Sequence, residues 1–245
     1  MCGAGTLALC KTLVDTGMVK IAEPEKHILM DTPSGTIKAT AICENGIVEK
    51  VKFRNIASFL YKKDLPLEIP GIGNIKIDIT YGGNFFVMVD ADRFEMELES
   101  KNAKKIAELG MIILQETNKR YNVSHPEREE ITFLNDIMFC KDPDENNPNY
   151  RNTVVFGDAQ IDRSPCGTGT CARMAKLYSE GKLKLNEEFV HESIIGTKFV
   201  GRITSEHKIG NINGIIPELE GECSVTGFNN FILDKNDTVG DGFIL

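Results

Sequence analysis

Apolar residues recur along the chain in two different patterns, and the change from one to the other predicts the order of the elements. Residues 6–16 carry apolar side chains at helical spacing and are followed by Gly17, which is suited to end a helix. A second helix is predicted over residues 101–120, with Ser100 as its candidate N-cap, and a third over residues 170–180. The long segments between these helices follow the other pattern.

In those segments apolar residues alternate with polar ones, and Gly, Pro and Asn mark the turns, which predicts mostly antiparallel strands. The predicted strands are residues 36–43, 47–53, 75–80, 85–89, 130–140 and 153–156. Residues 142–150 form a predicted polar loop, and the chain from Phe189 onward is predicted as strands with turns at 210–214 and 218–221. Few helices among many strands indicate an α+β fold.

A short motif occurs twice, each time at the start of a predicted helix. It reads Cys2-Gly3-Ala4-Gly5-Thr6 at the beginning of the chain and Cys166-Gly167-Thr168-Gly169-Thr170 before the third helix. Residues 81–87 and 226–232 form a weaker pair, in which a Gly-x-Asn turn leads into an apolar strand. The repeats predict two similar lobes, each a sheet wrapped on one helix, which we assign to residues 1–120 and 121–245.

Each copy of the motif places a cysteine at a helix N-terminus. The first amides of a helix have no partner within it, and the helix dipole is positive there, so a thiolate is favoured. The backbone N–H groups of Gly3, Ala4, Gly167 and Thr168 are expected to face an anionic ligand, because glycine allows a close approach. Two such halves can hold one cysteine on each side of a small anion.

Composition limits the classes of protein to be considered. The 245 residues are 41% hydrophobic and 26% charged, which is typical of a globular protein. A net charge of −8 argues against a nucleic-acid partner, and no apolar run has the length of a membrane span. Seven cysteines without a CxxC pair and four scattered histidines indicate reduced thiols in the cytoplasm and argue against a metal site.

The second motif and its flank resemble the second-cysteine signature of the proline racemase family, which includes 4-hydroxyproline 2-epimerases. The similar residues are Asp162-Arg163-Ser164-Pro165-Cys166-Gly167-Thr168-Gly169-Thr170, and residues 1–6, 81–86 and 191–196 resemble other family segments. Two features depart from the family pattern: the family carries further strands before the first cysteine, and it has histidine at the position of Ala4. The resemblance implies a diaminopimelate epimerase-like fold of two pseudo-symmetric lobes, each a curved, mostly antiparallel sheet around a central helix. The first lobe is expected to be incomplete here.

Inversion at an α-carbon without a cofactor needs one group to remove a proton from one face and another to deliver a proton to the opposite face. The resemblance implies these roles for Cys2 and Cys166, a contact of Asp162 with the ring nitrogen of the substrate, and an aromatic pocket position for Phe156. It implies a racemase or epimerase acting at C2 of proline or 4-hydroxyproline, with an imino acid as ligand, no cofactor, no metal and a homodimeric assembly.

Other interpretations of the same residues stay open. The chain begins one residue before Cys2 and has Ala4 in place of histidine, which favours a non-catalytic truncated paralogue or fragment that at most binds the amino acid. A third interpretation is a thiol redox protein in which Cys2 and Cys166 form a reversible disulfide. Phe156 is equally compatible with strand core, and Asp162 with a turn cap.

The remaining cysteines and histidines are expected to have structural roles. His191 falls in a predicted strand, where a structural histidine is expected rather than a base. Cys10 and Cys171 lie on the apolar faces of their helices, and the other three cysteines in predicted strands are Cys43, Cys140 and Cys223. All five are expected to behave as small core residues.

Overall fold

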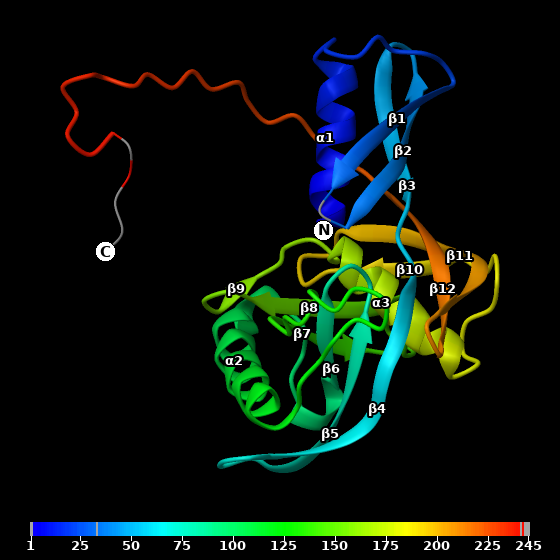
Figure 1. Ribbon diagram of the computed structural model, residues 1–245, viewed down its shortest axis with the longest axis vertical. Helices are drawn as coiled ribbons and strands as arrows, with labels where there is room; N and C mark the ends of the chain where they lie inside the picture. The colour runs from blue at the N-terminus through cyan, green and yellow to red at the C-terminus, as the bar shows by residue number, and fades with distance from the viewer. Residues whose placement is uncertain (1, 33, 241, 243–245) are drawn as a thin grey trace.

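The computed structural model of the protein describes residues 2–32, 34–240 and 242 (Figure 1). Met1, which precedes Cys2 in the first motif, lies outside that range. Within the described part of the chain, three α-helices accompany one sheet of twelve strands. The helices are α1 (Gly3–Asp15), α2 (Ala103–Arg120) and α3 (Gly167–Ser179). The α+β class expected from the sequence is confirmed, with strands making up most of the fold.

The strands are, in chain order, β1 (Glu25–Thr32), β2 (Gly35–Glu44), β3 (Ile47–Arg54), β4 (Ser58–Ile69), β5 (Gly73–Tyr81), β6 (Phe85–Asp90), β7 (Asp136–Lys141), β8 (Tyr150–Phe156), β9 (Gln160–Ile161), β10 (Phe189–Glu192), β11 (Lys198–Ile209) and β12 (Ile212–Gly221). They follow the order β1-β2-β3-β12-β11-β10-β8-β7-β6-β5-β4, with β9 paired to β8. The pairs β6–β7 and β8–β10 are parallel. Because β12 pairs with both β3 and β4, the strands from β4 to β12 close on themselves, and β1–β3 extend the sheet to one side.

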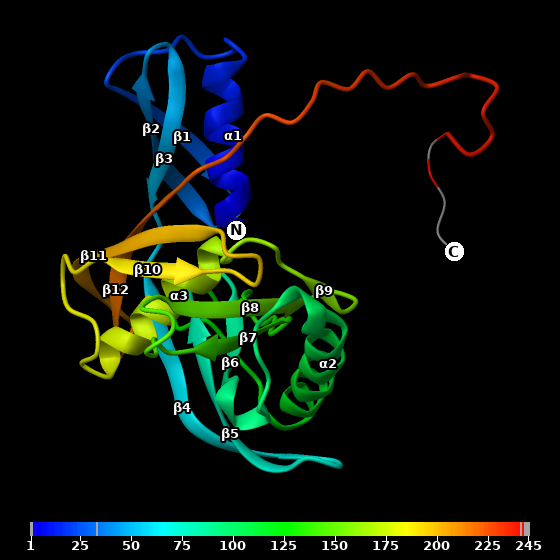
Figure 2. The same ribbon diagram turned by 180° about the vertical axis from the view of Figure 1, so that it is seen from behind.

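The helices occupy different positions relative to this sheet. Inside its closed part, α3 contacts β4, β5, β11 and β12, and most of its residues are buried. Beside that part, α1 contacts β2 and β3, and Figures 1 and 2 show it with β1–β3 at one end of the molecule. The third helix, α2, lies against β4, β7 and β8. No helix in the described residues is both long and apolar enough to cross a bilayer.

Glycine ends two of the helices, as predicted. Gly17 and Gly181 follow α1 and α3 with φ angles of +76° and +70°, a conformation that glycine adopts at little cost. The start of α2 differs from the prediction, because Ser100 does not act as its N-cap. A 3₁₀ turn over Ser100–Asn102 precedes the helix. The carbonyl oxygen of Ser100 accepts a hydrogen bond from the amide of Ala103.

Two segments between the helices also differ from the prediction. The strand predicted over residues 130–140 begins only at Asp136, because Asp136 pairs with Phe156, the last residue of β8, and β8 does not continue beyond it. Residues 218–221, predicted as a turn, continue β12 because they pair with β3. In both cases the neighbouring strand, rather than the local residues, sets where the strand ends.

The segment after β12 was predicted as a strand and is not one. Residues 226–232 have no regular structure and run away from the sheet (Figure 1). Phe228 and Phe231 in this segment are 81% and 92% exposed. Cys223, also predicted to lie in a strand, follows the end of β12 and is partly buried. An apolar period-two pattern does not form a strand where no neighbouring strand accepts its backbone hydrogen bonds.

Candidate functional site

The two helices that begin with a Cys-Gly sequence meet at their first residues. A Cβ atom built on Gly3 would lie 2.6 Å from the Cα atom of Gly167, and one built on Gly167 would lie 2.6 Å from the Cα atom of Gly3. Real Cβ contacts are not that short, so both positions require glycine. The structure therefore brings together the two copies of the repeated motif, and with them Cys2 and Cys166, which directly precede the glycines.

Cys2 occupies the N-cap position of α1. Its sulfur accepts a hydrogen bond from the amide of Gly5 at 3.3 Å, and its carbonyl accepts from the amide and the hydroxyl of Thr6. The side chain is exposed. The sulfur thus takes the place that a serine or aspartate oxygen has at an ordinary helix start.

Cys166 occupies the corresponding position of α3 in a different conformation. Its φ angle is +62°, a left-handed value that is rare for a residue with a side chain. Its amide donates to the hydroxyl oxygen of Ser164 at 3.1 Å, and its sulfur lies 3.7 Å from the hydroxyl of Thr168. The side chain is partly buried.

The surroundings of Cys166 disfavour its thiolate form. Burial raises the pKa of the Cys166 thiol, and the carboxylates of Asp162 and Asp136 raise it further. Hydrogen bonds from the amide of Gly169 and the hydroxyl of Thr168 act in the opposite direction without reversing the shift in pKa. The two cysteines therefore occupy equivalent helix ends but differ in burial, with Cys2 exposed and Cys166 partly buried.

Asp162 and Phe156, the two other side chains expected at the site, lie near Cys166. The Oδ1 atom of Asp162 accepts the amide of Ser164 at 2.8 Å, so it caps the turn that leads into α3. The same carboxylate acts on the pKa of Cys166. Phe156 is partly buried against the apolar cluster that also contacts Cys166. Asp162 thus combines the turn-cap geometry with proximity to the thiol.

Asp136, the first residue of β7, was not singled out from the sequence. It is partly buried and pairs with Phe156 across the sheet. Burial raises the pKa of its carboxyl to about 6, and a hydrogen bond from the Asn84 side chain opposes this rise only in part. In the sequence, the feature that marks Asp136 is its position directly before a run of apolar residues.

The turn before β6 packs against the first turn of α3. A Cβ atom on Gly82 would lie 2.2 Å from the carbonyl oxygen of Thr168 and 2.6 Å from the amide nitrogen of Ala172. Glycine at position 82 therefore permits the close approach that leads the chain to Asn84 and its hydrogen bond with Asp136. Of the weaker sequence repeat, only the first copy, residues 81–87, therefore packs against α3.

A cavity of about 700 Å³ opens beside the paired helix starts. Its lining includes Ala4 of the first motif and Pro165, the residue before the second motif, together with Phe199 and Cys223. The cavity therefore lies beside the starts of both helices, and its lining does not include the side chains predicted for the site, namely Cys2, Cys166, Asp162 and Phe156. Its size is in the range of pockets that take small molecules.

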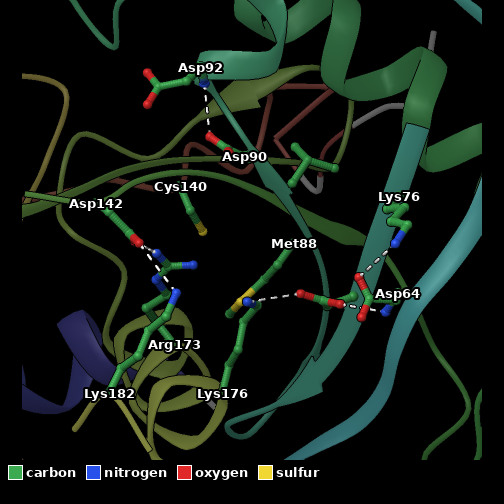
Figure 3. A pocket seen from close by; sticks show the side chains of 12 residues that line it. Asp64, Lys76, Met88, Asp90, Asp92, Cys140, Asp142, Arg173, Lys176 and Lys182 are labelled. Atoms are coloured by element: carbon green, nitrogen blue, oxygen red, sulfur yellow. Dashed lines mark hydrogen bonds and ion pairs between the residues drawn. The ribbon is translucent and has the colours of Figure 1, made fainter. Parts of the chain in front are cut away.

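A second pocket, of about 340 Å³, lies beside the C-terminal half of α3 and is lined mainly by charged side chains (Figure 3). Lys176 lies 3.0 Å from Asp78, Arg173 pairs with Asp142, and Lys182 lies 3.6 Å from Asp142. These cations and carboxylates neutralise one another. Neither motif cysteine lines this pocket, and the described residues contain no cluster of His, Cys, Asp and Glu that could hold a metal ion.

Comparison with known proteins relates the whole chain to one family. The sequence profile described as proline racemase matches residues 1–244. The proline racemase of Clostridioides difficile is 38% identical over 245 residues, which cover 100% of this chain and 73% of that protein. The proline racemase of Acetoanaerobium sticklandii is 41% identical over 244 residues, covering 99% and 73%. The 4-hydroxyproline 2-epimerase of Ancylobacter novellus is 37% identical over 245 residues, covering 100% and 73%.

Solved structures show the same relationship. A hydroxyproline epimerase from Agrobacterium vitis, with bound trans-4-hydroxy-L-proline, has a TM-score of 0.93 and 31% identity, over 100% of this chain and 70% of that one. A probable proline racemase from Agrobacterium radiobacter K84, with bound carbonate, has the same TM-score of 0.93 and 31% identity, over 100% and 72%. The chain belongs to the proline racemase family, and the curated members named above are isomerases.

Proposed function

We propose that the protein is a cofactor-independent racemase or epimerase that inverts C2 of proline or 4-hydroxyproline. The contact between Gly3 and Gly167 carries this proposal, because it joins the two helix starts that bear Cys2 and Cys166. Relatives named proline racemase and 4-hydroxyproline 2-epimerase, and a neighbour with bound trans-4-hydroxy-L-proline, support the substrate class.

In the proposed mechanism two sulfur atoms flank C2 of the substrate. The thiolate of one cysteine takes the proton from C2, and the thiol of the other gives its proton to the opposite face. One C–H bond breaks and another forms with inverted configuration, so the thiol and the thiolate have exchanged places at the end. The reverse reaction uses the same pair with the roles exchanged, which is why two similar groups suit this chemistry.

Backbone amides are the proposed binding groups for the substrate carboxylate. The N–H groups of Gly3, Ala4, Gly167 and Thr168 belong to the first turns of α1 and α3, where helix amides lack partners within the helix. Donors that are already oriented stabilise the negative charge that develops on the carboxylate when the proton leaves. Ala4 offers its amide whatever its side chain, so the absence of histidine there does not remove this donor.

Asp162 is the proposed partner of the substrate's ring nitrogen, because a carboxylate and a secondary ammonium form a charge-assisted hydrogen bond. The positive ammonium would also offset the negative charge that Asp162 places near Cys166, and so oppose the rise in the pKa of that thiol. Phe156 is the proposed apolar wall. In this scheme substrate binding prepares Cys166 to act as the base.

The finer description of the fold is also a proposal. Two pseudo-symmetric lobes, one around α1 and one around α3, are supported by the packing of each Cys-Gly helix on strands of the sheet. The division into residues 1–120 and 121–245 stays a prediction, and strands from both ranges pair within one sheet. The homodimeric assembly and the cytoplasmic location likewise stay predictions from the sequence.

Deuterium incorporation at C2 tests the proposed function. L-Proline and trans-4-hydroxy-L-proline are incubated with the protein in D₂O, and chiral chromatography with mass spectrometry follows inversion and label together. We expect the wild type to incorporate solvent deuterium at C2, and Cys2→Ser and Cys166→Ser each to lose inversion. Cys10→Ala is the control, because Cys10 is a buried cysteine on the same helix as Cys2 and is expected to be inert.

The alternatives give different results in the same experiment. Inversion by either serine variant at the wild-type rate contradicts the two-cysteine mechanism. A wild-type protein that binds the planar analogue pyrrole-2-carboxylate but incorporates no deuterium would be the non-catalytic alternative. A reversible disulfide between Cys2 and Cys166, without exchange at C2, would be the redox alternative.

A further inference from the structure

A fully buried polar cluster contacts the backbone around Cys166. It consists of Asn152 on β8, Thr170 on α3 and His191 on β10, each with 0% exposure. The Nδ1 atom of His191 lies 2.9 Å from the hydroxyl oxygen of Thr170 and 3.3 Å from Nδ2 of Asn152. The cluster thus links the helix that carries Cys166 to two strands of the sheet.

The cluster binds the peptide groups on both sides of Cys166. Asn152 donates from Nδ2 to the carbonyl oxygen of Pro165 at 2.7 Å. The hydroxyl of Thr170 donates to the carbonyl oxygen of Cys166 at 2.7 Å and lies 3.2 Å from that of Pro165. These two carbonyls belong to the peptide planes that flank the Cα atom of Cys166. Holding both planes determines the backbone angles of Cys166, including its φ of +62°.

The donors and acceptors around His191 indicate which of its ring nitrogens carries the proton. Thr170 has one hydroxyl proton, which its shortest contact directs to the carbonyl of Cys166, so we assign Nδ1–H of His191 as the donor to the Thr170 oxygen. Nδ2 of Asn152, 3.3 Å from Nδ1, is a donor as well, so in this tautomer that contact is not a hydrogen bond and Nδ2 keeps its bond to the carbonyl of Pro165. Nε2 of His191 has no partner among the described residues and is then an unprotonated ring nitrogen. Burial, with the positive charge of Arg173, lowers the pKa of His191 well below its usual value. The imidazole is therefore neutral.

We propose that His191 is a positioning residue for Cys166: it donates to Thr170, Thr170 and Asn152 hold the two peptide groups, and the left-handed backbone then directs the thiol at the start of α3. The inference rests on the proposed function, in which Cys166 exchanges a proton with C2 of the substrate. His191 itself contacts no reacting atom. Neutral imidazole suits this role, because a charged ring in an apolar interior would be costly.

Two threonines of the chain allow a matched test. Thr170 and Thr117 are both 0% exposed, both lie in helices, and each donates its hydroxyl to the carbonyl four residues earlier, at 2.7 Å and 2.8 Å. Thr117 lies in α2, away from both cysteine motifs. Thr170→Val and Thr117→Val therefore remove the same local hydrogen bond, and only the first disturbs Cys166.

Three measurements separate positioning from simple stabilisation. We expect both valine variants to lower Tm, and Thr170→Val to lower it more, because it also leaves Nδ1 of His191 without its acceptor. Only Thr170→Val is expected to change the ratio of Cys166 to Cys2 alkylation by iodoacetamide, by several-fold in peptide mass spectrometry. Only Thr170→Val is expected to lower kcat, by about 10- to 100-fold with KM within about twofold, because a small displacement of a proton-transfer group is costly. Thr170→Ser, which keeps the hydroxyl, should restore both.

The wild-type protein provides a test that needs no variant. In ¹⁵N NMR, His191 is expected to show a protonated Nδ1 and an unprotonated Nε2, with shifts that do not change across the range where an ordinary histidine titrates, about pH 5 to 8. A ring that titrates in that range overturns the proposal. So do equal effects of Thr170→Val and Thr117→Val on the alkylation ratio and on kcat.

Failure of this inference can be told from failure of the proposed function. Alkylation of Cys166 does not depend on turnover, so a changed ratio in Thr170→Val supports positioning even if the wild type incorporates no deuterium at C2. A wild type that inverts its substrate, with Thr170→Val inverting equally fast and alkylated equally, overturns positioning alone.

Discussion

Gly3 and Gly167 touch through their backbones, and neither position leaves room for a side chain. The contact joins the start of α1 to the start of α3, so it places the two Cys-Gly motifs at a single point of the fold. Gly82 makes a similar approach to the first turn of α3 from another side. The candidate site therefore depends on three positions at which a methyl group would displace a backbone.

Gly3→Ala is expected to move α1 away from α3, because the added methyl group would overlap the backbone of Gly167. The expected loss in free energy of unfolding is about 1–3 kcal/mol, as for overpacked interiors. Deuterium incorporation at C2 should fall more steeply, since about 1 Å of displacement strongly slows proton transfer. Gly227→Ala is the control, because a Cβ atom there meets no atom within 4 Å. Equal losses in urea denaturation for the two variants would contradict the close contact.

Cys2 is expected to react with iodoacetamide before Cys166. Cys2 is exposed, whereas Cys166 is partly buried and its pKa is raised by burial and by Asp162. Asp162→Asn should speed alkylation of Cys166 several-fold in mildly alkaline buffer, because removing the negative charge lowers the pKa of the thiol. Peptide mass spectrometry measures both sites at once. Asp158→Asn, at an exposed position between β8 and β9, serves as the control and should change neither rate.

Asp136→Asn is expected to stabilise the protein near neutral pH. The carboxyl has a pKa of about 6 in the folded protein, against an ordinary value of 3.8, so its ionisation opposes folding. This destabilisation is absent below about pH 4, grows as the pH rises toward about 6, and then amounts to at most about 3 kcal/mol. Chemical denaturation of wild type and variant should give stabilities that diverge as the pH rises. Parallel curves would show that Asp136 ionises normally.

Glu180, which follows α3, is expected to have the opposite pH dependence. Burial acts to raise its pKa, but Lys176 and other lysines outweigh this and lower the pKa of Glu180 to about 2, against an ordinary value of 4.5. Its ionised form therefore stabilises the fold, fully above about pH 4.5, and the contribution is lost as the pH falls toward about 2. Glu180→Gln should lower the free energy of unfolding near neutral pH by about 2–3 kcal/mol.

The control for this prediction is Glu129→Gln, at an exposed glutamate. It should leave the free energy of unfolding unchanged within about 0.5 kcal/mol. If Glu180→Gln behaves in the same way at neutral pH, the cluster of lysines around Glu180 does not stabilise the fold.

The helices could be predicted from the sequence more closely than the strand ends. Gly17 and Gly181 act through their own backbone angles, so the ends of α1 and α3 are visible locally. The start of β7 at Asp136 is not, because it depends on where β8 stops. Residues 226–232 have a strand-like pattern and no neighbouring strand. A period-two pattern shows which side chains share a face but not which strand pairs with them.

In the candidate site, too, some residues could be predicted from local sequence and others depend on contacts between distant segments. The chemistry of a thiol at a helix start and the resemblance to a racemase family pointed to Cys2, Cys166 and Asp162. Asp136 was missed because one acidic residue before an apolar strand is a common pattern. The hydrogen bonds that join His191 to Thr170 were likewise not visible, since residues far apart in the sequence make them.

The sequence by itself determined the helices, the α+β class and the two cysteine motifs, because these follow from local spacing and from the chemistry of single residues. Only the tertiary structure decided that Gly3 lies against Gly167 and that Asp136 raises the pKa of Cys166. It also decided that the buried His191 contacts Thr170 in the helix that follows Cys166. Such contacts depend on the path of the chain between distant segments, and on the partner that each strand finds in the sheet. No local pattern of hydrophobic and polar residues specifies either of these.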